Sequence, residues 1–206
     1  MPVLDAIRRF ADRLAETPTT FHWLRKLPEA NYRTTKSRIR AVRDAIGAPR
    51  TLDLGCGTGE YSRLFAPDRY LGVDVHPGYI AFAKRRNPQH HYLCGDARIW
   101  QGDGTPFELV LVNGVLHHLD DEAARAFLSA AHGHLAPGGT LLVIEDVDLP
   151  AASFGTRLVH LLDHGDHIRD AGRWQELVAD VATIARSETY TSGICPYHLM
   201  LCRKPA

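Results

Sequence analysis

The residues best suited to ligand chemistry lie in the stretch TLDLGCGTGE, residues 51–60. A short apolar run ends there in three glycines at alternating positions. Residues without a Cβ atom allow unusual backbone dihedral angles and a close approach to a ligand. The first N–H groups of a following helix can then bind polar ligand atoms. We therefore predict a ligand-binding turn, whose candidate contact residues are Asp53, Gly55, Cys56, Gly57 and Gly59.

Two acidic residues follow the next two predicted strands. Asp74 ends one of them and precedes Val75, and Asp96 follows the other and precedes Ala97. Ligands of open α/β sheets bind outside the carboxyl ends of the strands. A carboxylate at Asp74 could accept hydrogen bonds from both ribose hydroxyls of a nucleoside. One at Asp96 could accept from an exocyclic amine such as that of adenine, so an adenosine-containing ligand is expected.

The ordered segments LDLGCGTGE, GVDVHP, CGDAR, FELVLVNGVLHHLDDE and LAPGGTLLVIED resemble the motifs of class I S-adenosylmethionine-dependent methyltransferases. The resemblance covers about residues 50–147. It implies S-adenosyl-L-methionine as the cofactor and S-adenosyl-L-homocysteine as its product. The glycine spacing is one residue tighter than the dinucleotide fingerprint, which fits the amino-acid end of this cofactor better than a pyrophosphate.

The resemblance also implies a role for individual residues. The three glycines would wrap the methionine part, and Asp53 would orient the turn or reach the amino group through water. The two carboxylates would hold the ribose and the adenine, with Val75 and Ala97 beside them. Asn113 would offer its backbone carbonyl to the ammonium group, and His118 with Leu119 would line the pocket.

Methyl transfer from a sulfonium is an in-line displacement, so alignment and exclusion of water supply much of the catalysis. A base is needed only when the acceptor must lose a proton early. The candidates are His117, after the fourth predicted strand, and His164 and His167, which share a helical face with His160. That face could form a base cluster or a metal site, or have ordinary surface roles, and we predict no metal.

The acceptor side is expected to come from two connections. In this superfamily the segment between the fifth and sixth strands, with the N-terminal segment, commonly forms the acceptor pocket. Arg169 could pair there with an anionic acceptor, and Asp146, which follows the fifth predicted strand, is a further candidate for substrate contact. Tyr32 and Lys36 could close over the cofactor from the other side.

Composition indicates a globular protein. The 206 residues are 45% hydrophobic and 23% charged, with a formal net charge of zero. No apolar run approaches the roughly 20 residues of a membrane span, and the charged first residues lack a signal-peptide core. We expect a cytoplasmic protein with a small-molecule acceptor, no nucleic-acid partner and no membrane partner; the oligomeric state cannot be read from the sequence. Residues 1–50 hold 11 Lys or Arg against 5 Asp or Glu, which suggests an anionic substrate or a solvated arm.

Periodicity predicts one domain of the doubly wound α/β class. The expected elements include a helix that opens at residues 60–65, a fifth strand at 140–145 and two last strands at about 182–189 and 197–202. Strands and helices alternate after residue 50, which favours a mostly parallel seven-stranded sheet with one antiparallel C-terminal strand and helices on both faces. N-terminal helices precede it. The expected parts are an arm or lid (1–48), a cofactor-binding core (49–150), a helical acceptor-side insertion (151–182) and a C-terminal hairpin (183–206).

Two other functions remain open at this point. A nicotinamide-dependent oxidoreductase would need the dinucleotide spacing of glycines, which this sequence does not have. A non-catalytic protein of the same fold, acting as a cofactor sensor or partner subunit, has no sequence feature against it.

Overall fold

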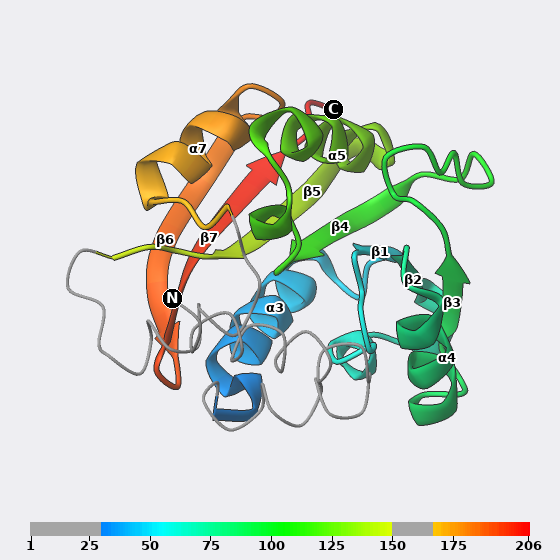
Figure 1. Ribbon diagram of the computed structural model, residues 1–206. Helices are drawn as coiled ribbons and strands as arrows, with labels where there is room; N and C mark the ends of the chain where they lie inside the picture. The colour runs from blue at the N-terminus through cyan, green and yellow to red at the C-terminus, as the bar shows by residue number, and fades with distance from the viewer. Residues whose placement is uncertain (1–29, 150–166) are drawn as a thin grey trace.

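The chain folds around one seven-stranded sheet in the computed structural model, which describes residues 30–149 and 167–206 (Figure 1). The strands are β1 (Thr51–Leu54), β2 (Tyr70–Asp74), β3 (His91–Cys94), β4 (Phe107–Asn113), β5 (Leu135–Asp146), β6 (Ile184–Ser192) and β7 (Cys195–Arg203). Their order in the sheet is β3-β2-β1-β4-β5-β7-β6. β7 runs antiparallel to both of its neighbours, β5 and β6, and the other six strands share one direction. The predicted fold class is confirmed.

Helices cover both faces of the sheet (Figure 1). The described helices are α3 (Arg33–Ile46), α4 (Pro77–Arg86), α5 (Asp121–Gly133) and α7 (Ala171–Ala179), with short 3-10 turns η1 (Ala30–Tyr32), η2 (Ser62–Leu64), η3 (Pro67–Arg69) and η4 (Leu116–His118). Buried residues of α5 and α7 belong to one hydrophobic core, and those of α3 and α4 belong to another. None of the helices within 30–149 and 167–206 is long and apolar enough to cross a membrane.

The two cores arise from the alternation of side chains along the central strands. Val110 and Val112 of β4 face the core under α5 and α7, whereas Leu109 and Leu111 face the core under α3 and α4. A strand buried on both faces must be apolar at successive positions. The continuous apolar run of β4 is therefore the sequence signature of a central strand.

Short acidic caps begin two of the helices. Oδ1 of Asp120 accepts a hydrogen bond from the backbone N–H of Ala123 at 2.8 Å, at the start of α5. Oδ1 of Asp170 accepts from Arg173 N–H at 2.8 Å, at the start of α7. Each cap satisfies an N–H group that has no partner inside the helix. α5 thus begins close to the end of β4, where the ligand-binding edge lies.

Several predicted boundaries were wrong. The sequence predicts a helix over residues 60–65, but the structure has only the 3-10 turn η2. Gly59 has a φ of +70° and Pro67 follows soon after, so the interval is too short for an α-helix. β5 begins at Leu135 rather than Thr140, because Leu135 already pairs with Phe107 of β4. The register then shifts before regular pairing resumes at Thr140.

The C-terminal hairpin is present with longer strands than predicted, since β6 reaches Ser192 and β7 begins at Cys195. The helices predicted before residue 30 and across residues 150–166 lie outside the described residues. The division into arm, core, insertion and hairpin stays a prediction.

Candidate cofactor and methyl-transfer site

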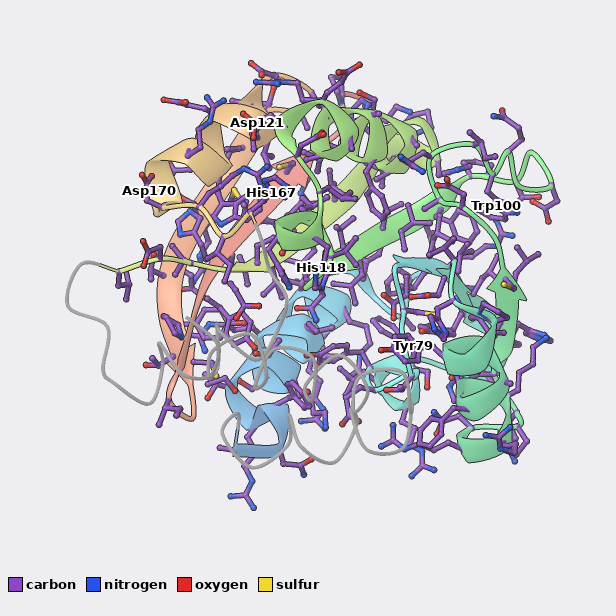
Figure 2. The ribbon with its side chains drawn as sticks, viewed as in Figure 1. Tyr79, Trp100, His118, Asp121, His167 and Asp170 are labelled. Carbon is purple, nitrogen blue, oxygen red and sulfur yellow. The ribbon has the colours of Figure 1, made fainter. Side chains whose placement is uncertain are left out.

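A cavity of about 500 Å³ lies at the carboxyl ends of the parallel strands. The strand order reverses between β1 and β4, and ligands of open α/β sheets bind beside such a point. Two of the lining residues, Tyr79 and His118, are labelled in Figure 2. The wall consists of Gly55, Gly57, Val73, Asp74, Val75, His76, Tyr79, Gly95, Asp96, Ala97, Arg98, Gly114, Val115, His118, Leu119 and Phe127.

The glycine turn forms one side of the cavity. Gly55, Gly57 and Gly59 have φ values of +76°, +52° and +70°, a region that side-chain-bearing residues rarely adopt. A Cβ atom on Gly55 would lie 2.0 Å from Cγ2 of Val115, so the turn and the segment after β4 are in close contact. A Cβ atom on Gly57 would meet nothing within 4 Å. Gly57 therefore leaves open space on the cavity side.

Asp74 connects the glycine turn to the end of β2. Its Oδ2 atom accepts a hydrogen bond from Gly57 N–H at 2.8 Å, and its Oδ1 atom accepts from His76 N–H at 2.8 Å. Burial raises the pKa of this carboxyl above its usual value, and the two N–H groups oppose that rise. Each carboxylate oxygen retains acceptor capacity beyond one bond. Asp74 can therefore hold the turn and still accept from ribose hydroxyls.

Asp96 lies on the cavity wall in a close ion pair with Arg98. Nη2 of Arg98 lies 2.6 Å from Oδ2 of Asp96, and Nε lies 3.0 Å from Oδ1. The backbone N–H of Arg98 also donates to Oδ1, at 2.9 Å. Hydrogen bonds from Arg98 lower the pKa of Asp96. The ion pair keeps the carboxylate charged and fixes its direction, as an acceptor for an exocyclic amine requires.

Asp53 lies behind the glycine turn and outside the cavity wall. Its Oδ2 atom accepts a hydrogen bond from the Tyr70 hydroxyl at 2.7 Å, and both side chains are buried. Burial raises the pKa of Asp53 to about 7, against the opposing effect of the Tyr70 hydrogen bond. In this structure the carboxyl supports the base of the turn.

Glu145, near the end of β5, binds the backbone of the segment that follows β4. Oε1 of Glu145 accepts from the N–H groups of Val115 and Leu116 at 3.0 and 2.9 Å. Nδ1 of His117 lies 2.8 Å from Oε2 of Glu145 and 3.6 Å from Oδ2 of Asp146. His117, Glu145 and Asp146 are all completely buried. The candidate base His117 thus faces the protein interior, while His118 presents an imidazole to the cavity.

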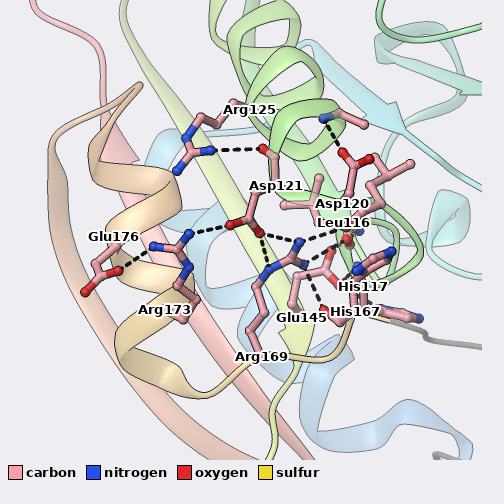
Figure 3. A network of polar contacts seen from close by, with 12 residues as sticks. Leu116, His117, Asp120, Asp121, Arg125, Glu145, His167, Arg169, Arg173 and Glu176 are labelled. Carbon is pink, nitrogen blue, oxygen red and sulfur yellow. Dashed lines mark hydrogen bonds and ion pairs between the residues drawn. The ribbon is translucent and has the colours of Figure 1, made fainter.

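Arg169, predicted to bind an anionic acceptor, instead binds the protein itself (Figure 3). Its Nη2 and Nε atoms lie 2.7 and 2.9 Å from Oδ1 of Asp121. It also donates to the backbone carbonyls of Leu116, Leu119 and His167. With its side chain 8% exposed and its donors engaged, the guanidinium is outside the cavity wall. The role of Arg169 toward an acceptor stays a prediction.

The N-terminal candidates lie beside the glycine turn but not on the cavity wall. Nζ of Lys36 forms an ion pair with Oε1 of Glu60 and donates to the Asn31 carbonyl at 3.1 Å. Tyr32 packs edge-on against Tyr61, with ring centroids 5.9 Å apart. These contacts fix the start of α3 against the turn.

The structure brings together only part of the predicted site. The predicted residues on the cavity wall are Gly55, Gly57, Asp74, Val75, Asp96, Ala97, His118 and Leu119. The predicted residues in the described ranges but off that wall are Tyr32, Lys36, Asp53, Cys56, Gly59, Asn113, Asp146, His117, His167 and Arg169. Cys56 is buried, and burial raises the pKa of its thiol. His164 lies outside the described residues, so its role stays a prediction.

Some wall residues were not anticipated. Arg98 follows Asp96 at a spacing of two, which is a recognisable Asx-turn signal. His76 and Tyr79 stack with ring centroids 4.3 Å apart, and both line the cavity. Their proximity depends on how α4 begins after β2. Across residues 30–149 and 167–206, no group of three His, Cys, Asp or Glu could hold a metal ion.

The fold and the site define an α/β protein with a nucleoside-sized cavity at its topological switch point. A methyltransferase domain family matches residues 51–139. An uncharacterized methyltransferase of Mycobacterium bovis is 30% identical over 134 residues, which are 63% of this chain and 67% of that protein. The chain belongs to the class I S-adenosylmethionine-dependent methyltransferases, as its motifs predicted.

Two further similarities bear on fold and acceptor. A trans-aconitate 2-methyltransferase of Methylobacterium radiotolerans is 36% identical over 116 residues, 54% of this chain and 44% of that protein. The chain thus spans less than half of that relative's length. The crystal structure of the N-methyltransferase NodS from Bradyrhizobium japonicum, in complex with S-adenosyl-L-homocysteine, has a TM-score of 0.74. It is 19% identical and aligns over 97% of this chain and 99% of that chain, which shows the shared fold.

Proposed function

We propose that this protein is an enzyme that transfers a methyl group from S-adenosyl-L-methionine to a small-molecule acceptor. Asp74 carries the proposal, because its carboxylate binds the N–H of Gly57 and also lies on the cavity wall. An acid in that position can fix the glycine turn and receive ribose hydroxyls at once. Membership of the methyltransferase family supports the reaction type.

The residues of the cavity fit the cofactor. About 500 Å³ lies within the usual range for small-molecule sites, roughly 300–1,000 Å³. Val75 is 68% exposed beside Asp96 and Ala97, so an apolar surface is available to a purine ring. We infer that Asp74 holds the ribose, Asp96 receives the adenine amine, and Gly57 admits the methionine part.

The contribution of the chain to the reaction is chiefly one of position. When bound, S-adenosyl-L-methionine supplies a methyl group already activated by its sulfonium. The turn at Gly55–Gly59 and the segment after β4 hold it from two sides. Alignment of two reactants within a dry site can account for a large part of the rate enhancement. His118 faces the cavity from the segment after β4.

Relatives support a small acceptor. One is named a trans-aconitate 2-methyltransferase, and another is named a demethylmenaquinone methyltransferase. Each name belongs to that protein, and the two matches cover 54% and 56% of this chain. We propose a small metabolite rather than a nucleic acid as the acceptor of this chain. A cytoplasmic location stays a prediction from the sequence.

Calorimetric titration and turnover test the proposal. We expect the full chain to bind S-adenosyl-L-homocysteine and to show no binding of NAD. Methyl transfer from labelled S-adenosyl-L-methionine is then measured on small-molecule acceptors that include trans-aconitate and demethylmenaquinone. No binding of S-adenosyl-L-homocysteine would refute the proposal. Binding without turnover on a broad panel would favour the alternative, a cofactor sensor or partner subunit.

A further inference from the structure

The segment Val115–Leu119, on the cavity wall, takes its backbone partners largely from distant residues. Glu145 accepts the N–H groups of Val115 and Leu116 at 3.0 and 2.9 Å, and that of His117 at 3.4 Å. The carboxylate is completely buried and belongs to the end of β5. A carboxylate that accepts the N–H groups of three successive residues holds their backbone in place.

Arg169 donates hydrogen bonds to backbone carbonyl groups of the same segment. Its Nη2 atom donates to Leu119 O at 2.8 Å, and its Nη1 atom donates to Leu116 O at 3.3 Å. Asp121 fixes the guanidinium by two bonds of 2.7 and 2.9 Å. The guanidinium carbon lies 4.7 Å from the ring centroid of Trp174, over its face. The cation is therefore held on several sides.

Leu116 links the two charged groups. Its N–H donates to Glu145 and its C=O accepts from Arg169, so a single peptide segment lies between a buried anion and a buried cation. Moving the segment would leave both buried side chains without these partners, which is unfavourable for polar groups away from water. Val115, His118 and Leu119 of the same segment line the cavity. Their positions follow from bonds made outside it.

We propose that Arg169, acting with Glu145, is a positioning residue that sets the shape of the cofactor cavity through the segment Val115–Leu119. The inference rests on the proposed function, because it assigns Arg169 a role in cofactor binding. Arg169 is not on the cavity wall, so its effect on the cofactor passes through the backbone that it holds. Asp121 supports it as the anchor of the guanidinium.

The test measures the affinity for S-adenosyl-L-homocysteine by calorimetry in folded full-length variants. We expect Arg169→Lys, which loses the fork geometry, to weaken binding about tenfold, equivalent to about 1.4 kcal/mol. Asp121→Asn is the milder second variant and should weaken binding several-fold, whether or not Arg169→Lys folds well. Hydrogen exchange should rise at the amides of His118 and Leu119 in both.

Two controls separate positioning from general destabilisation. Arg173→Lys alters the other ion pair of Asp121, but no described contact of Arg173 is with the segment Val115–Leu119. Met200→Ala opens the core at β7, away from the cavity wall, and should lower the stability of the protein. Both should bind within about twofold of the wild type.

The outcomes are distinct. Weakened binding in Arg169→Lys and Asp121→Asn with unchanged controls supports the inference. Unchanged binding in both variants, or an equal loss in Met200→Ala, overturns it while the wild type still binds. A wild type that does not bind S-adenosyl-L-homocysteine overturns the proposed function and this inference together.

Discussion

The Tyr70 hydroxyl donates a hydrogen bond to the carboxyl of Asp53 at 2.7 Å, from one strand to its neighbour, beneath the glycine turn. Both side chains are buried. Gly72 pairs with Asp53 across the two strands and lies two residues after Tyr70 on β2. A Cβ atom on Gly72 would lie 2.8 Å from Sγ of Cys56 and 3.0 Å from the Tyr70 hydroxyl oxygen. The absence of a side chain at Gly72 therefore makes room for this buried pair.

The pair predicts an unusual pH dependence of stability. Burial raises the pKa of Asp53 to about 7, so the folded protein keeps a proton that the unfolded chain loses above about pH 4. This contribution is fully present below about pH 4 and is lost as the pH rises through about 7, on the order of 4 kcal/mol in all. Asp53→Asn, which does not titrate, should lack that decline.

Urea unfolding of the wild type and Asp53→Asn at a series of pH values checks the prediction. Because other groups titrate as well, the relevant quantity is the difference between the two free energies of unfolding. That difference should shift in favour of the variant as the pH rises to about 7. A difference that is constant across this range would contradict the prediction.

The cofactor turn could be predicted from sequence because its information is local. The glycines, the strand before them and the acid that ends β2 lie within a short stretch whose spacing reflects backbone conformation. The same holds for the apolar run of β4 and for the order of the sheet, which follows from alternating strands and helices. The fold class is confirmed, and the cofactor roles of the turn residues stay predictions.

Arg169 shows why the rest could not be predicted. Its position in the connection after β5 suggested an acceptor contact, but its guanidinium binds Asp121 and Leu116, which are about 50 residues earlier in the chain. Side-chain pairing across such distances follows from the packing of α5 and α7 together. His117 is similar, since its partner Glu145 becomes a neighbour only when β4 and β5 pair.

Asp74 should be essential for cofactor binding. In Asp74→Asn one oxygen becomes an NH2 group, which would face the N–H of Gly57 or of His76, donor against donor. We expect the affinity for S-adenosyl-L-homocysteine to fall at least about 30-fold, or about 2 kcal/mol, with some loss of stability. Calorimetric titration measures it. Asp68→Asn, at an exposed acid in η3, controls for the lost charge and should bind normally.

Substitution by alanine should lower the stability of the protein by different amounts at Gly55 and at Gly57. Gly55→Ala places a Cβ atom 2.0 Å from the Val115 side chain at a φ of +76°, so it carries both a clash and backbone strain. Gly57→Ala has a φ of +52° but meets no atom within 4 Å, so it carries strain alone, about 1–2 kcal/mol. Thermal or urea unfolding should show a clearly lower stability for Gly55→Ala than for Gly57→Ala. Equal stabilities would show that the turn and the Val115 segment are not in close contact.

Glu60 connects the helices α3 and α4 to the glycine turn that it follows. Its side chain is 9% exposed and pairs with Lys36 of α3 and with Nη1 of Arg86, at the end of α4, at 3.0 Å. Removing the charge leaves two partly buried cations without their counter-ion, which is costly in a low-dielectric setting. Glu60→Gln should lower the free energy of unfolding by on the order of 2–3 kcal/mol.

The exposed pair of Arg43 and Asp44 offers a matched comparison for Glu60. Asp44 is 64% exposed, so Asp44→Asn should change stability by less than about 1 kcal/mol.

A double-mutant cycle of Glu60→Gln with Lys36→Met then isolates the interaction energy between Glu60 and Lys36, because the second substitution should cost less once the first is made. Additive effects would mean that Lys36 and Glu60 contribute independently. In that case α3 would be anchored to the turn by the Tyr32–Tyr61 contact rather than by charge.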